Sequence, residues 1–134
     1  MTLHLLKLCV GADTIADLED YQSRRRGAPV HVTRMVPRRA EDLLDGGSLY
    51  WVIKGQIAVR QRLEAIEPFV DGDGTGRCRL VLDPAIVRVR PRPFRAFQGW
   101  RYLAPEDCPP DLTSRDAAEM PEALRNELAA LGLL

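Results

Sequence analysis

The run Leu49-Tyr-Trp-Val-Ile-Lys-Gly-Gln-Ile-Ala-Val59 is the strongest strand signal in the chain, and it makes a sheet the basis of the fold. β-branched and aromatic side chains dominate the run, and these types are enriched in strands because they pack well on a pleated surface. Gly55 interrupts it, which indicates a bulge or bend. We therefore predict that residues 49–59 form one central strand.

Shorter segments on both sides of this run also carry strand patterns, namely residues 3–10, 30–36, 60–69, 78–82 and 86–90. The turn sequence Asp71-Gly-Asp-Gly-Thr-Gly76 separates two of them, and its Asp-Gly pairs favour tight reversals, so these two are predicted to form a hairpin. The turn superficially resembles a calcium loop. However, Leu82 stands where the EF-hand pattern requires Glu, so we predict a hairpin tip and no calcium site.

Helical patterns are short. Asp13 or Thr14 can cap a helix that ends near Arg24, residues 38–44 indicate one or two helical turns, and residues 121–131 form an amphipathic pattern. Short strands with closely spaced turns and two or three short helices predict an α+β fold built on a small mixed sheet or partly closed barrel.

No internal repeat or low-complexity run divides the chain. Its length suits one domain, which we place at residues 1–112. Residues 113–134 would then carry a C-terminal amphipathic helix, packed on this domain or partly mobile.

The charges of the chain are segregated although they sum to zero. Residues 24–101 hold fifteen Arg and one Lys against eight acids, whereas residues 1–23 and 102–134 are both net acidic. A basic middle can create a local positive field that attracts an anionic partner even when the total charge is zero. The preference for Arg over Lys is explained equally well by codon bias, so only the placement of the arginines carries the argument.

Half of the aromatic residues fall in one nine-residue window, 94–102, directly after the arginine-rich segment 86–93. Bases stack on aromatic rings and phosphates attract guanidinium groups, so this arrangement is typical of a surface that binds nucleic acid. The alternative is that Phe94, Phe97 and Trp100 fill the core while the arginines are only solvated. The sequence leaves both interpretations open.

The candidate nucleic-acid-binding residues follow from the placement of the basic side chains. Four arginines between residues 88 and 95 have no acid among them and hence no local salt-bridge partner. A second basic run, residues 24–39, either extends the same face or forms a solvated loop. The predicted binding residues are Arg34, Arg38, Arg39, Tyr50, Lys54, Arg60, Arg88, Arg90, Arg92, Arg95 and Trp100.

Other site classes are not predicted. Three separated cysteines without a C-x-x-C pair argue against a disulfide framework or zinc knuckle, and His4 and His31 are expected to be structural. No phosphate-binding loop, dinucleotide fingerprint or nucleophile elbow occurs, so neither a cofactor nor a catalytic residue is assigned. No signal peptide is recognised and no apolar run approaches the roughly 18 residues of a membrane span, so a cytoplasmic location is expected.

Two strings, Tyr50-Trp-Val-Ile-Lys-Gly55 and Phe97-Gln-Gly-Trp-Arg-Tyr102, are specific enough to identify a family. Together with His31–Arg39, residues 1–112 resemble an uncharacterised group of short bacterial proteins, described only as a domain of unknown function. That resemblance implies no activity.

A more distant resemblance is to the PUA-like superfamily of small RNA-binding barrels, including its ASCH and EVE branches. In those folds a short basic helix leads to a turn similar to Asp45-Gly-Gly47, followed by a long barrel strand, here residues 49–59. This resemblance implies a PUA-like partly closed barrel. ASCH relatives with amidohydrolase activity carry a G-x-K-x-x-E-x-R pattern, from which this sequence departs after Lys54 because no Glu lies between it and Arg60.

Three hypotheses for function result. The leading one is binding of RNA, or of a modified base in nucleic acid, through Arg88, Arg90, Arg92 and Arg95, with Trp100 or Tyr50 stacking on bases. The second is a small enzyme acting on a nucleoside derivative in the barrel cleft, with Lys54 as general base or electrostatic stabiliser and Glu64 as its partner. The third is a protein-interaction module, for example a homodimer, with the aromatic window as the core of the interface.

Overall fold

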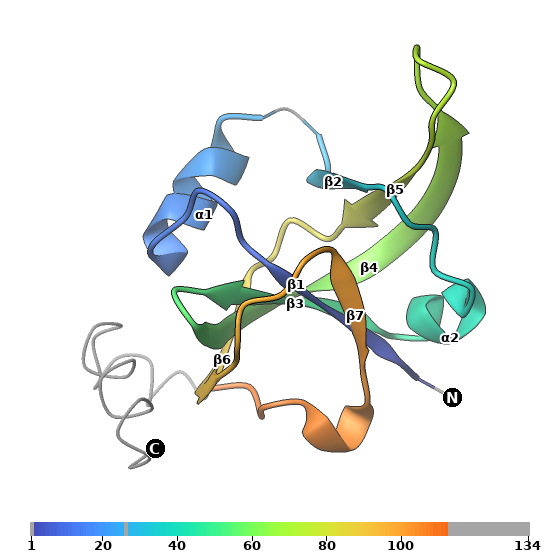
Figure 1. Cartoon of the computed structure of the whole chain (residues 1–134). Coiled ribbons are helices and arrows are strands. Elements are labelled where there is room, and N and C mark those ends of the chain that lie inside the picture. The colour runs from blue at the N-terminus through green and yellow to red at the C-terminus, as the bar shows by residue number, and fades with distance from the viewer. Residues whose placement is uncertain (1, 26, 113–134) are drawn as a thin grey trace.

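The computed structural model describes residues 2–25 and 27–112, which fold around one mixed sheet (Figure 1). Its strands are β1 (His4–Leu8), β2 (Val30–Thr33), β3 (Ser48–Ile53), β4 (Gln56–Val70), β5 (Gly76–Leu82), β6 (Val87–Pro93) and β7 (Trp100–Leu103). The helices are α1 (Ile15–Ser23), α2 (Ala40–Leu44) and the short 3-10 turn η1 (Pro105–Asp107). The helix predicted at residues 121–131 lies outside the described residues.

Six of the strands follow the order β2-β5-β4-β3-β1-β7. β6 lies outside this order and pairs with β4. β1 and β3 are parallel, whereas the other strand pairs are antiparallel. The long β4 pairs with β3 and β6 through its first half and with β5 through its second half. The α+β class and the mixed sheet with short helices are confirmed, and in the described part of the chain the sheet is not closed.

The single strand predicted over residues 49–59 is wrong, because the chain reverses in the middle of it. Lys54 and Gly55 have φ of 52° and 80°, and Ile53 pairs directly with Gln56, so β3 and β4 form a hairpin with a two-residue turn. Two consecutive left-handed residues match the twist of the flanking strands. The turn is hidden in the sequence because a non-glycine residue such as Lys54 rarely adopts positive φ.

α1 begins at a capping box. The Thr14 side chain accepts a hydrogen bond from the Asp17 backbone N–H at 3.1 Å, and the Asp17 carboxylate accepts one from the Thr14 N–H at 3.2 Å. These bonds satisfy donors that the first helical turn leaves without partners. Of the two caps that the sequence predicts, Asp13 and Thr14, the structure therefore uses Thr14. Ile15 and Leu18 bury the inner face of the helix.

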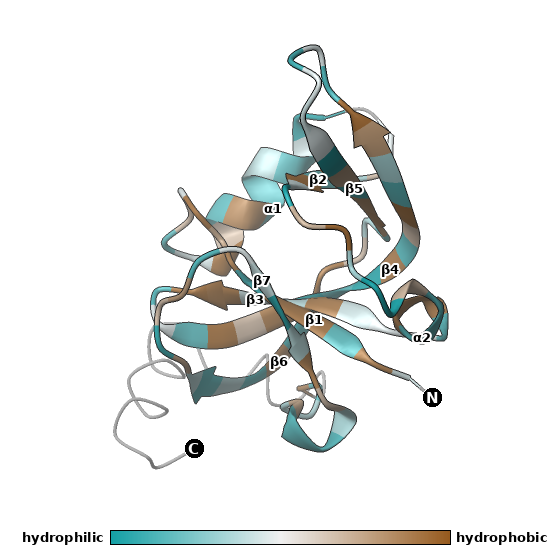
Figure 2. Cartoon of the chain, turned by 45° about the vertical axis from the view of Figure 1, so that its right-hand side comes forward, coloured by the Kyte–Doolittle hydropathy of each residue, from teal (hydrophilic) through white to brown (hydrophobic). Residues whose placement is uncertain are grey.

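The centre of the sheet is buried on both faces, which explains the nearly continuous apolar runs of β1 and β3. Leu5 and Trp51 pack in one cluster with the buried side chains of α1, whereas Leu6 and Tyr50 pack in a second cluster with Val89. Figure 2 shows hydrophobic residues concentrated on the central strands, with hydrophilic residues on much of α1 and at the tip between β4 and β5. Within the described residues, no helix is long and apolar enough to cross a bilayer.

The predicted hairpin is confirmed as β4 and β5, which are joined through residues 71–75. One carboxylate oxygen of Asp71 accepts hydrogen bonds from the backbone N–H groups of Asp73 and Thr75, and the other contacts the Arg77 guanidinium. The carboxylate of Asp71 is thus used to hold the turn together.

Candidate functional site

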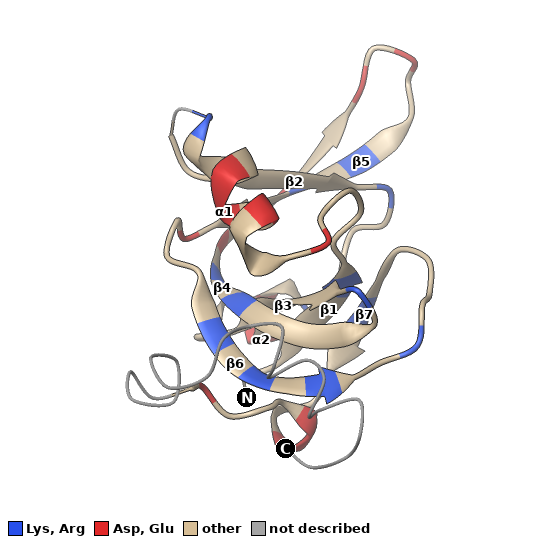
Figure 3. Cartoon of the chain, turned by 90° about the vertical axis from the view of Figure 1, so that its left-hand side faces the viewer, with Lys and Arg blue, Asp and Glu red and all other residues tan. Residues whose placement is uncertain are grey.

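Arginine recurs along β6, as the blue segments of this strand in Figure 3 show. Arg88 is half-buried. Val89 and Pro91 are buried while Arg90 and Arg92 are exposed, so core and surface positions alternate over this part of β6, whereas Val87 and Arg88 are both half-buried. Arg95 is exposed just beyond the strand. We refer to Arg88, Arg90, Arg92 and Arg95 as the β6 arginines.

Few contacts neutralise the β6 arginines. Arg88 lies 3.3 Å from the Glu19 carboxylate of α1, and Arg92 donates a hydrogen bond to the backbone oxygen of Asp107 at 2.6 Å. For Arg90 and Arg95 no ion pair is present among residues 2–25 and 27–112. Lys54 is exposed and lies close to the C-terminal end of β6. The two are near each other because the N–H of Phe94, the residue after β6, donates to the backbone oxygen of Gly55 at 2.9 Å.

Arg60, by contrast, is engaged within the fold. Its guanidinium forms two hydrogen bonds with the Asp111 carboxylate, at 2.7 and 2.6 Å, and a third with the Ser48 hydroxyl at 3.1 Å. The ion pair raises the pKa of Arg60 and lowers the pKa of Asp111. Arg60 therefore ties the segment after η1 to β4 and is poorly placed to bind a phosphate.

The remaining predicted arginines lie elsewhere. Arg34 is exposed after β2, whereas Arg38 and Arg39 precede α2, and Arg39 pairs with Asp42 at 2.9 Å. β2 pairs with β5 and not with β6, and Figure 1 shows α2 and β6 on opposite sides of the molecule. Sheet pairing thus does not join the second basic run to the β6 arginines.

The two rings predicted to stack on bases are buried. Tyr50 is 4% exposed and packs edge-on against His4, while Trp100 is 9% exposed and its indole N–H donates to the Met35 backbone oxygen at 3.0 Å. Neither ring presents an open face to a ligand in this conformation. The interpretation of the aromatic window as core residues fits these positions better, because Phe94 and Phe97 also pack against the second core cluster.

The geometry required by the enzyme hypothesis is absent at the residues proposed for it. Lys54 is exposed at the hairpin turn, and Glu64 is exposed on β4. A catalytic lysine would be expected in a cleft beside its partner, where desolvation tunes its pKa. The described structure therefore gives no support to Lys54 as a general base.

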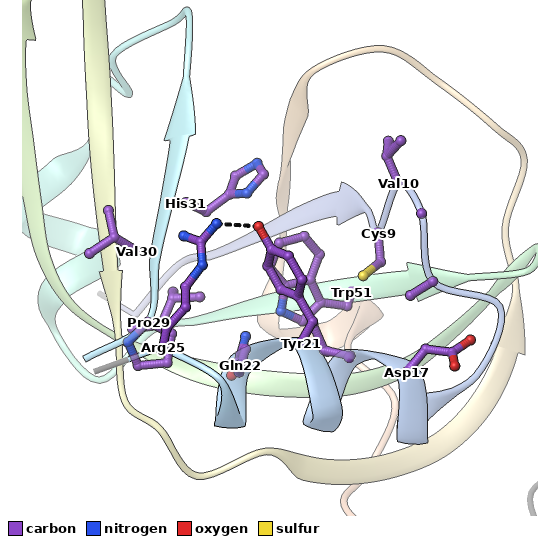
Figure 4. A pocket seen from close by; sticks show the side chains of 14 residues that line it. Cys9, Val10, Asp17, Tyr21, Gln22, Arg25, Pro29, Val30, His31 and Trp51 are labelled. Atoms are coloured by element: carbon purple, nitrogen blue, oxygen red, sulfur yellow. Dashed lines mark hydrogen bonds between the residues drawn. The ribbon is translucent and has the colours of Figure 1, made fainter. Parts of the chain in front are cut away.

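A cavity of about 270 Å³ lies between α1 and the sheet, where no site was predicted (Figure 4). Tyr21 and Gln22 extend from α1, Arg25 follows its end, and His31 comes from β2. Cys9, just after β1, and Trp51 of β3 also line it. These residues come from separate segments, so no spacing in the sequence indicates the cavity.

A buried amide network holds the Trp51 indole in this wall. Gln61, with 0% exposure, accepts hydrogen bonds from the Trp51 indole N–H and the Gln22 amide, both at 2.9 Å. Its own amide donates to Gln22 at 2.7 Å and to the Asp83 backbone oxygen at 3.1 Å. Since every member is paired, the network fixes the orientation of the indole.

The titratable groups in the interior of the cavity are neutral at pH 7. Burial raises the pKa of the Cys9 thiol to about 11 and lowers the pKa of His31 to about 4. The His31 ring packs edge-on against Trp51, with 5.2 Å between ring centres, and its buried Nε2 has no hydrogen-bond partner in the described residues. His31, which the sequence predicts to be structural, thus lies in the wall of the cavity.

The depressed pKa of His31 predicts a stability that falls in mild acid. Between pH 6.5 and about pH 4, His31 is protonated in the unfolded chain but neutral in the folded chain. The free energy of unfolding therefore decreases as the pH falls through this window. Lys7 adds to the depression by repelling the imidazolium. Urea unfolding of wild type and His31→Gln at pH 7 and pH 5 tests this. From pH 7 to pH 5, the free energy of unfolding should fall by about 1 kcal/mol more in wild type than in the variant. Equal losses would contradict this pKa.

Comparison with known proteins places the chain in a family without assigning an activity. The sequence model of the family described as "Protein of unknown function (DUF1489)" matches residues 5–134, and so extends beyond the 1–112 range of the predicted resemblance. No curated protein and no solved structure gives a significant match. The chain belongs to the DUF1489 family of proteins of unknown function.

Proposed function

We propose that this chain binds single-stranded RNA along the β6 arginines. The observation that carries the proposal is that Arg90 and Arg92 of β6 and Arg95 just beyond it are exposed, and that Arg90 and Arg95 have no ionic partner in the described structure. The sequence contains no acid from residue 84 to residue 105. Of the acids that the fold brings beside β6, Glu19 pairs with Arg88 and Asp111 pairs with Arg60, which leaves Arg90 and Arg95 as unpaired positive charges in the described structure. A guanidinium is planar and donates two parallel hydrogen bonds to a phosphate, which suits these arginines to a nucleic-acid backbone.

Phosphate contacts would supply most of the affinity, because the rings of Tyr50 and Trp100 are buried. Contacts to phosphate position a strand without reading its bases. The proposal therefore predicts weak base preference and strong salt dependence.

The resemblance to the PUA-like superfamily supports the same proposal. As in that superfamily, the short α2 leads through Asp45-Gly-Gly47 into a strand, here β3, which has six residues and belongs to a sheet that is not closed in the described residues. A cytoplasmic location, where RNA is abundant, is part of this proposal.

Alanine variants of the β6 arginines test the proposal. Fluorescence anisotropy of a labelled, short, mixed-sequence RNA should show about a tenfold weaker Kd for the double variant Arg90→Ala/Arg95→Ala, since the loss of two phosphate contacts costs about 1.4 kcal/mol or more. The matched control is Arg79→Ala on β5, an exposed arginine whose guanidinium lies over the Phe69 ring at 3.8 Å. Its affinity should stay near the wild-type value. Equal affinities for all three proteins would contradict the proposal, and DNA of the same sequence tests the preference for RNA.

A further inference from the structure

The cavity between α1 and the sheet does not contribute to the proposed RNA contacts, and its walls have features of a ligand site. Its volume of about 270 Å³ is close to the lower end of the range for small-molecule pockets, roughly 300 to 1,000 Å³. A single ring or a fused pair of rings fits such a volume better than a larger ligand.

The interior of the cavity selects for an uncharged group. The thiol of Cys9 and the imidazole of His31 are both neutral at pH 7, because burial shifts the pKa of each away from neutrality. The Gln22 amide is held by Gln61. A charged group placed among these side chains would lose its hydration without gaining a counter-charge.

The aromatic wall selects for a flat group. Trp51, 4% exposed, is held by the amide network at the base of the cavity, and the His31 ring stands at 90° to it, so Tyr21 provides most of the open aromatic surface. Tyr21, 57% exposed, lies at the mouth (Figure 4). Aromatic surfaces attract planar rings through stacked and edge-on contacts.

The mouth of the cavity selects for an anion. The Arg25 guanidinium bonds to the Tyr21 hydroxyl and lies 4.7 Å from the centre of that ring, and no carboxylate pairs with it among the described residues. Asp17 also lines the cavity, but it stands in the first turn of α1, at the opposite end of the helix from Arg25 (Figure 4), and one of its carboxylate oxygens accepts hydrogen bonds from the Asp13 and Thr14 N–H groups at 3.0 and 3.2 Å. Arg25 is therefore the charge at the mouth that is available to a ligand.

We propose that this cavity binds a small molecule that combines a flat, uncharged ring with one anionic group, the ring lying in the cavity among Tyr21, His31 and Trp51 and the anion at Arg25. Two sources share this chemistry, a nucleoside monophosphate and an aromatic carboxylate. The site uses no β6 arginine, so it does not depend on the proposed RNA binding.

Isothermal titration calorimetry on the full chain tests the proposal with four kinds of compound. These are the nucleoside 5′-monophosphates, the corresponding nucleosides, ribose 5-phosphate and indole-3-acetate. At least one compound with both ring and anion should bind with a Kd below about 1 mM, whereas nucleosides and ribose 5-phosphate should bind about tenfold more weakly or not at all. Binding of the nucleotides or of indole-3-acetate identifies the source. If neither binds, the proposal is overturned.

Adjacent arginines provide a matched pair of variants. Arg25→Gln should weaken binding of the anionic compound about tenfold, because it removes the charge at the mouth. Arg24→Gln should leave it unchanged, since Arg24 is exposed and pairs with Asp20 at 2.9 Å outside the cavity. Equal effects of the two variants on the affinity would overturn the assignment of Arg25 as the contact for the anion. The double variant Arg90→Ala/Arg95→Ala should bind the small compound normally, so a failure of RNA binding leaves this test intact.

Discussion

Replacement of Gly47 by alanine is expected to lower the free energy of unfolding by about 3 kcal/mol or more, the largest effect of any substitution considered for this chain. A Cβ at this position would stand 2.2 Å from the Leu3 backbone oxygen and 2.3 Å from the Leu43 backbone oxygen. Both obstacles are backbone atoms, so no side-chain rotation relieves the overlap. The Gly47 N–H donates to Leu43 at 3.0 Å, and its oxygen accepts from the Leu63 N–H at 2.9 Å, which fixes the segment between α2 and β3.

Urea unfolding followed by circular dichroism measures this effect. The matched control is Gly72→Ala in the exposed tip between β4 and β5, where nothing lies within 4 Å of an added Cβ. The control should differ from wild type by less than about 1 kcal/mol. If Gly47→Ala unfolds at the same urea concentration as wild type, the close approach of Leu3 and Leu43 is wrong.

The substitution Gln61→Leu is expected to have the second large effect, lowering the free energy of unfolding by about 3 kcal/mol. Leucine is close to glutamine in size but accepts and donates no hydrogen bond. The substitution would leave the Trp51 indole N–H and the Asp83 oxygen without the partner they have at Gln61. A buried donor without a partner costs about 1 to 3 kcal/mol, whereas Gln22, at the edge of the network, can turn to water.

Gln98→Leu serves as the control for this substitution, because Gln98 is exposed. Its stability should lie within about 0.5 kcal/mol of wild type. Gln61→Leu should also shift the emission of Trp51, which loses its fixed hydrogen bond. A variant with wild-type stability and unchanged emission would show that the amide network does not hold the indole.

Local features of the fold are predictable from the sequence, because a short range of residues determines them. The alternation around Val89 follows from the two-residue period of a strand, and the cap at Thr14 depends only on the next few residues. The turn at Lys54 is an exception. Its positive φ is dictated by the pairing of β3 with β4, which overrides the ordinary preference of lysine.

The candidate sites were predictable only in part. The β6 arginines are visible in the sequence because they share one segment. The burial of Trp100, in contrast, depends on a hydrogen bond to Met35, which is 65 residues away along the chain. The cavity at Trp51 and His31 is assembled from distant segments in the same way. Periodicity cannot show which side of a loop packs inward, so these positions require the three-dimensional structure.

RNA binding by the β6 arginines is tested most directly by the salt dependence of the affinity. Anisotropy of labelled single-stranded RNA, measured over a salt series, should give a slope of log K against log salt concentration of about −2 to −3, as expected for three or four phosphate contacts at about 0.7 each. The double variant Arg90→Ala/Arg95→Ala should reduce the magnitude of this slope by about 1.4. A slope near zero, or one that the double variant leaves unchanged, would contradict the proposal.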